Sequence, residues 1–174
     1  MKKLFLLIIS LIAFNSSYCQ SPPFTFKADG STDYVIYSLA KMKAPQLYNK
    51  TLAWINEFYE NPDSVIKAKT ENEMIRINGF MKDAFIRQLS TSTTGYDCSY
   101  TLVIEFQDGK YRIKFDVNEI TVDNNKVFFS LIDVINNIKD KNGNHFNGSV
   151  DSFEVSVNNL MDLHHKNVQN QNKW

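Results

Sequence analysis

The stretch "SYTLVIEFQDGKYRIKFDV", from Ser99 to Val117, decides the fold. Asp108 and Gly109 offer the positive φ values that a two-residue hairpin turn needs. With these two residues at the turn, one face of the hairpin is apolar and the other carries an opposite-charge pair. The cross-strand pairs are then Gln107 with Lys110, Phe106 with Tyr111, Glu105 with Arg112, Ile104 with Ile113, and Leu102 with Phe115. Because a slip of one residue would reverse both faces, the pattern predicts an antiparallel sheet in this register.

The polar face of this hairpin is a candidate partner-facing surface. It carries Glu105, Arg112 and Lys114. Antiparallel sheets commonly leave one face to water, so the simpler interpretation of these charges is plain solvation. Both interpretations place the three side chains on the face opposite the core.

A helix is predicted upstream, in "LYNKTLAWINEFYENP", Leu47 to Pro62. At about 100° per residue its apolar side chains, Phe58 among them, fall in one continuous arc, as a helix laid on a sheet requires. Pro62 stops the helix. Trp54 and Tyr48 lie in the arc, and core packing is the simpler role for such large rings. The alternative is that these two rings line a site for a small apolar ligand.

The remaining patterns predict one α+β domain over residues 33–168, after an extended lead-in over 20–32 and before a polar tail over 169–174. We expect an antiparallel sheet with helices packed on one face. The further predicted elements are a strand over 33–40, a hairpin over 64–80, a Ser/Thr-rich loop over 86–97, a turn at Asn124–Asn125, a helix over 127–143, and a last helix with a capping box of Asp151 and Glu154 and a buried face of Phe153, Val157, Leu160, Met161 and His164.

The first residues, "MKKLFLLIISLIAFNSSYCQ", have the layout of a signal peptide over residues 1–19, cleaved before Gln20. The protein is therefore expected in the periplasm, the envelope or outside the cell. Tyr18 is too bulky for the residue before a lipid-modified cysteine, which disfavours an anchor at Cys19. After cleavage no apolar run is long enough to span a membrane.

Charge and cysteine content restrict the function further. The chain has 19 basic and 19 acidic residues, without the clustered surplus of Lys and Arg that nucleic-acid binding needs. If Cys19 leaves with the signal peptide, Cys98 is the last cysteine and no internal disulfide forms. A packed core must then supply the stability.

Motifs for catalysis, metal binding or cofactor binding do not occur in the sequence. Adjacent helical residues point about 100° apart, so His164 and His165 do not hold one metal ion together, and no metal site is predicted. Protonated His165 near a helix end would gain from the helix dipole. Cys98 is expected to be a small buried hydrophobe rather than a nucleophile. We therefore expect neither an enzyme nor a cofactor.

The runs "LYNKTLAWINEFYENPDSVIKAKTENEMIRINGF" and "YTLVIEFQDGKYRIKF" resemble the domain of unknown function 4468, a family of small exported proteins of Bacteroidetes-type bacteria with a TBP-like fold. The shared features are the Leu-Tyr entry to the Trp-containing helix, its Asn-Pro exit and the Asp-Gly hairpin. The resemblance covers about residues 33–122 and implies a TBP-like sheet with helices on one face. It implies no functional residue, and the region 127–168 matches no family pattern.

Three functions remain open at this point. The first is a non-enzymatic exported module that binds a protein, peptide or envelope glycan through a sheet edge or the polar sheet face. The second is a carrier of a small apolar ligand between helix and sheet, lined by Trp54 and Tyr48. The third is an enzyme of unknown type, which would need a cleft gathering His145, Cys98 or several carboxylates.

Overall fold

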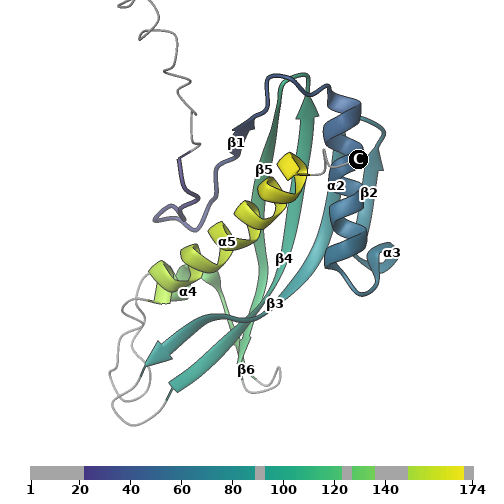
Figure 1. Cartoon of the computed structure of the whole chain (residues 1–174). Coiled ribbons are helices and arrows are strands. Elements are labelled where there is room, and N and C mark those ends of the chain that lie inside the picture. The colour runs from purple at the N-terminus through teal and green to yellow at the C-terminus, as the bar shows by residue number, and fades with distance from the viewer. Residues whose placement is uncertain (1–21, 89–92, 123–126, 136–148, 171–174) are drawn as a thin grey trace, which may run out of the picture.

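The computed structural model describes residues 22–88, 93–122, 127–135 and 149–170. In chain order the elements are β1 (Val35–Ser38), α2 (Ala44–Phe58), α3 (Pro62–Val65), β2 (Ile66–Thr70), β3 (Met74–Gln88), β4 (Thr93–Gln107), β5 (Lys110–Val122), β6 (Val127–Phe129), α4 (Leu131–Ile135) and α5 (Ser149–Asn170). The long helices α2 and α5 lie on the same face of the sheet (Figure 1). This arrangement confirms the predicted α+β class.

The sheet has the strand order β1-β5-β4-β3-β2, and β6 pairs with β5 at its far end. Neighbouring strands run antiparallel. The predicted hairpin register is confirmed, because Glu105 lies opposite Arg112 and Leu102 lies opposite Phe115. Gly109 has φ +79 at the turn, a value that glycine adopts without strain.

The core lies between the sheet and the two long helices. Alternate residues of the central strands point into it, as the period of two requires. The largest fully buried side chains of these strands are Ile75, Ile77, Phe85, Tyr100, Leu102, Tyr111 and Phe115. From the helices, the buried residues include Leu47, Trp54, Ile55, Phe153, Val157 and Met161. The two helices therefore cover one face of the sheet with apolar stripes.

A close approach between β3 and β4 depends on Gly79, which lies directly opposite Tyr100. A Cβ atom on Gly79 would lie 2.3 Å from the Tyr100 ring, so only glycine leaves room for that ring. The Tyr100 hydroxyl then lies 2.9 Å from that of Tyr59, directly after α2. Burial raises the pKa of Tyr100 to about 12, so this phenol stays neutral and can share a hydrogen bond.

The hairpin turn also holds the start of α2. One oxygen of Asp108 accepts a hydrogen bond from the Ala44 N–H at 3.0 Å, and the other lies 2.9 Å from Lys43 Nζ. Anionic groups stabilise a helix N-terminus because the first N–H groups lack partners within the helix. The hydrogen bond from Ala44, followed by the one from Lys43, lowers the pKa of Asp108. The residue that makes the turn therefore caps the helix as well.

The lead-in over 20–32, predicted to be an extended segment before the domain, packs against α5 through Phe24 and Phe26. Phe24 is buried, its N–H donates to Asn158 Oδ1 at 2.8 Å, and its ring meets Phe115 edge-on. The Phe26 N–H donates to Glu154 Oε1 at 2.7 Å. Prolines and a glycine suggested a loop, but the phenylalanines among them find apolar partners in the core.

The Ser/Thr-rich segment over 86–97 is strand rather than loop wherever the structure describes it. Ile86 pairs with Gly95 and Gln88 pairs with Thr93. The loop prediction is therefore wrong, because threonine is β-branched and fits a strand as well as it fits a turn. Residues 89–92 lie outside the described residues.

The helix predicted over 127–143 begins later than predicted, because the described part of this segment starts as a strand. Val127–Phe129 is strand β6, paired with β5, and the helix α4 spans Leu131–Ile135 only. The run of apolar residues was compatible with either period, and pairing with a neighbouring strand decided it. The predicted turn at Asn124–Asn125 and residues 136–148 lie outside the described residues.

The last helix has the predicted buried face but different ends. Phe153, Val157, Leu160, Met161 and His164 are all buried, which confirms the pattern. α5 begins at Ser149, so Asp151 lies within its first turn, and Glu154 binds the lead-in instead of closing a capping box. The helix continues to Asn170, which corrects the polar tail over 169–170. Across the described ranges, no helix is long and apolar enough to cross a membrane.

Candidate functional site

The face of the sheet turned away from α2 and α5 is the candidate site, and we call it the open face. Its residues alternate with core-facing residues along β3, β4 and β5, because successive side chains of a strand point to opposite faces. The open face comprises Arg76, Asn78, Phe80, Ser99, Thr101, Val103, Glu105, Arg112, Lys114 and Asp116. It therefore contains all three residues that the sequence suggested as partner-facing.

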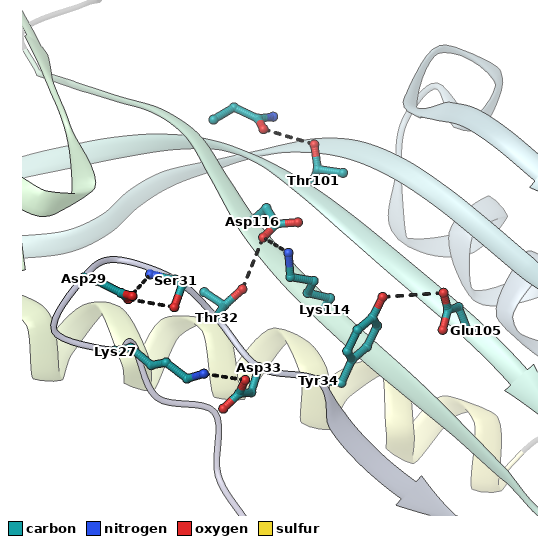
Figure 2. Close-up of polar contacts among 11 residues, drawn as sticks. Lys27, Asp29, Ser31, Thr32, Asp33, Tyr34, Thr101, Glu105, Lys114 and Asp116 are labelled. Carbon is teal, nitrogen blue, oxygen red and sulfur yellow. Dashed lines mark hydrogen bonds and ion pairs between the residues drawn. The ribbon is translucent and has the colours of Figure 1, made fainter.

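A first cluster on the open face joins Tyr34, Glu105 and Arg112. The Arg112 Nε atom forms an ion pair with Glu105, and the guanidinium carbon lies 4.1 Å from the centre of the Tyr34 ring. The Tyr34 hydroxyl is 3.5 Å from Glu105 Oε1 (Figure 2). The hydrogen bond with Glu105 raises the pKa of Arg112. The side chains of Arg112 and Glu105 remain 50% and 32% exposed, so the pair is accessible to a partner.

A second cluster joins Lys114, Asp116 and Thr32. Lys114 Nζ lies 2.8 Å from Asp116 Oδ1, and the Thr32 hydroxyl donates to the same oxygen at 3.2 Å (Figure 2). Thr32 belongs to the segment that precedes β1 and runs beside β5. The open face thus presents two ion pairs, while its third cation, Arg76, has no ion-pair partner among the described residues.

Between the charges and the β3 side lies an uncharged polar centre. Thr101 is only 5% exposed even though it is on the open face. Its hydroxyl is 3.0 Å from Asn78 Oδ1 and 3.1 Å from Asn118 Oδ1. One hydroxyl proton serves one acceptor at a time, and the NH2 groups of both amides point away from Thr101. We missed this cluster in the sequence, although strand alternation already placed Thr101 on the polar face.

The two predicted ligand-lining residues are deep in the core. Trp54 is 1% exposed; it stacks on Phe58 at 5.1 Å between ring centroids and meets the His164 ring edge-on at 4.8 Å. Tyr48 is 5% exposed and packs edge-on against Phe106. Phe58, expected in the core, is 42% exposed and covers the outer side of Trp54. The exposure of Phe58 corrects the apolar arc at its C-terminal end.

The adjacent histidines have different partners, His164 in the core and His165 at its partly buried edge. His164 Nε2 is 2.9 Å from the Thr51 hydroxyl, and burial lowers the pKa of His164 to about 3. His165 Nδ1 is 2.7 Å from the Tyr111 hydroxyl, and burial lowers its pKa too, opposed by Asp162. The helix-dipole interpretation of His165 is wrong. α5 continues beyond His165 to Asn170, so His165 does not lie in the last turn of the helix, where the dipole acts.

Reactive groups do not gather at any place that the structure describes. Within the described ranges there is no group of three or more His, Cys, Asp or Glu residues that could hold a metal ion. Cys98 is fully buried, and burial raises the pKa of its thiol to about 12. This confirms Cys98 as a buried residue. His145 lies outside the described residues.

The hairpin, the open face and α2 all belong to a known family domain. A family model described as a domain of unknown function (DUF4468) with TBP-like fold matches residues 34–130. The chain belongs to the DUF4468 family. The match runs from the residue before β1 to the end of β6, so it includes the open face, whereas α5 follows the DUF4468 match in the sequence.

Solved structures share the fold of this DUF4468 protein. A DUF4468 family protein from Bacteroides ovatus matches with a TM-score of 0.58 at 14% identity, over 87% of this chain and 89% of that chain. A TBP-like protein from Parabacteroides distasonis matches with a TM-score of 0.52 at 16% identity, over 79% and 92%. No curated protein gives a significant match. At these identities the structures establish the fold, and activity does not follow from fold.

Proposed function

We propose that this DUF4468 protein is an exported, non-enzymatic module that binds a protein, peptide or glycan partner in the cell envelope through its open face. One observation carries the proposal: Glu105, Arg112, Lys114 and the Thr101 cluster share a sheet surface that α2 and α5 leave uncovered. Side chains on strands are held more rigidly than those on loops, which suits recognition.

The state of the best nucleophile and base supports a non-enzymatic role. A reactive cysteine is a thiolate and a general base has a pKa near the working pH. Burial instead raises the pKa of the Cys98 thiol to about 12 and lowers the pKa of His164 to about 3. Both groups are therefore neutral and enclosed at pH 7.

The charges of the open face weigh against a nucleic-acid partner. Binding to phosphates releases counterions only when Lys and Arg are available to replace them. Arg112 and Lys114 are already paired with Glu105 and Asp116, which leaves Arg76 as a single cation of the face without a carboxylate among the described residues. A phosphate backbone would have to displace these carboxylates and would meet their negative charge.

The sheet edges are less suited to binding than the open face. The edge strand β1 has four residues, and the opposite edge strand β2 has five, with a register irregularity between Ile66 and Ala68. Lys67 and Lys69 lie on β2. Short strands, irregular register and edge lysines are the usual means by which proteins prevent strand addition.

The structure gives less support to the alternative function, a carrier of a small apolar ligand. The rings of Trp54 and Tyr48 are enclosed by Phe58, His164 and Phe106 rather than facing a groove. Aromatic contacts of this kind are ordinary core packing.

Photo-crosslinking in the producing cells tests the proposal. A photoreactive amino acid at Val103, in the middle of the open face, is compared with the same substitution at Val155, which is 58% exposed on α5. We expect a discrete adduct from Val103 and none from Val155. Absence of an adduct at Val103, or the same adduct at both positions, would contradict binding through the open face.

A further inference from the structure

We infer that the partner of the open face is a neutral polysaccharide, with a sugar ring stacked on Phe80 and its hydroxyls bonded around Thr101. This inference rests on the proposed function and names the chemistry of its partner. Three independent features of the surface lead to it: the balance of its charges, an exposed aromatic ring, and a group of unused amide donors.

The charge balance selects an uncharged partner. Arg112 and Lys114 are each neutralised by a carboxylate within the face, and the exposed Arg76 has no ion-pair partner among the described residues. At the end of the row through Phe80 and Ser99, the exposed Glu119 lies opposite Ser99. A carboxylate there accepts hydrogen bonds from hydroxyl groups and repels acidic sugars and phosphates. The surface complements a neutral, hydroxyl-bearing chain better than a polyanion.

Phe80 supplies the apolar platform. Its side chain is 57% exposed on β3, whereas most of the described phenylalanines are buried in the core or packed against it. The negative face of an aromatic ring attracts the positive C–H groups of a partner, and the faces of sugar rings are made of such groups. An exposed phenylalanine beside polar residues therefore fits a ring that is apolar on its face and polar at its rim.

The polar groups lie where the rim of that ring would be. Ser99 is directly opposite Phe80, and Asn78 and Thr101 are opposite one another in the next row. Residues two apart on a strand are separated by about 7 Å, so the Asn78 amide and the Ser99 hydroxyl flank the Phe80 ring. Both asparagine oxygens face Thr101, and among the described residues neither NH2 group, of Asn78 or of Asn118, has another partner. Hydroxyl oxygens of a sugar are suitable acceptors for these donors.

An extended peptide is the competing occupant, and the surface fits it less well. A peptide that adds to a sheet uses the backbone groups of an edge strand, whereas β3 and β4 at Asn78 and Thr101 are paired with each other. Side-chain amides and one exposed ring remain as the recognition groups of the face.

A binding assay on the exported, processed protein tests the inference. The probes are an array of neutral oligosaccharides (from dextran, xylan, laminarin and galactomannan), with oligogalacturonate and a set of ten-residue peptides for comparison. We expect binding to at least one neutral oligosaccharide, weakened about tenfold or more by Phe80→Ala and by Asn78→Ala. Ile86→Ala is the matched control, because Ile86 is an exposed apolar residue of the same strand, 50% exposed. This variant should bind within about twofold of the wild type.

The outcomes separate the two proposals. Binding to peptides or oligogalacturonate alone would overturn the polysaccharide partner. Neutral-sugar binding that survives Phe80→Ala overturns the stacking of the sugar on Phe80 in particular. If the Val103 adduct forms in cells while the neutral oligosaccharides do not bind, the open face is a partner surface and the partner is not a neutral sugar. If neither the adduct nor any array binding is seen, both proposals fail. Circular dichroism of each variant verifies folding.

Discussion

Lowering the pH from 7 to 5 should destabilise the fold through His164. This side chain is fully enclosed, and its pKa falls from 6.5 in the unfolded chain to about 3 in the folded one. The unfolded state therefore binds the proton first, and stability that is present above pH 6.5 is lost as the pH falls. Integrating the difference in bound protons from pH 7 to pH 5 gives a loss of about 2 kcal/mol in the free energy of unfolding.

Urea denaturation followed by circular dichroism at pH 7, 6 and 5 measures this loss. His164→Gln is the comparison, because an amide can keep a hydrogen bond to Thr51 but does not titrate. The variant will be less stable throughout, so the pH dependence is compared rather than the absolute free energy. His165 and the carboxylates contribute equally to both proteins. Equal pH dependence in the wild type and the variant would refute the enclosed, neutral His164.

Three further predictions concern packing, reactivity and export. Gly79→Ala should lower the free energy of unfolding by about 1–3 kcal/mol, because a Cβ would lie 2.3 Å from the Tyr100 ring. In a Tyr100→Ala background the same substitution should cost much less, and equal losses in both backgrounds would refute the contact. Cys98, whose thiol pKa is raised to about 12, should resist iodoacetamide in the folded protein and react in urea, and mass spectrometry would reveal any labelling before unfolding. The protein recovered from the producing cells should begin at Gln20 by mass, and a retained leader or a lipid-modified first residue would disprove the cleavage site.

The hairpin could be predicted from sequence because two independent signals agree there. The Asp108–Gly109 turn and the alternation on both arms demand one register, and a slip exposes every apolar side chain at once. The buried face of α5 could be predicted equally well, because Phe153 and Val157 follow the helical period. The family resemblance added the topology, which local patterns do not encode.

The wrong predictions of secondary structure and burial share one cause. At each of these positions two local structures were compatible with the sequence, and tertiary contacts decided between them. Phe24 sits among prolines and polar residues, and its burial depends on a slot beside Phe115 that is formed by distant strands. The threonine-rich segment and Val127–Phe129 became strands because a neighbouring strand was available to pair. Propensity at such positions is a weak prior that pairing overrides.

Part of the candidate site could be predicted from the sequence. Glu105, Arg112 and Lys114 follow from the hairpin register alone. The cluster of Asn78 and Thr101 required the register between β3 and β4, which the sequence did not provide because residues 89–92, between these strands, contain no glycine that would signal a hairpin turn. Exposure of Phe80 was hidden for a different reason: an aromatic residue in a strand is assigned to the core by default.

Hydroxyl-radical footprinting by mass spectrometry, with and without the envelope fraction of the producing cells, tests the central claim most directly. In the free protein Phe80 should be oxidised, whereas Tyr100 and Phe115, at 1% and 0% exposure, should not. Adding the envelope fraction should protect Phe80 while Leu163 on α5 stays reactive. Protection of the α5 surface with an unchanged Phe80 would contradict the open face as the site of recognition.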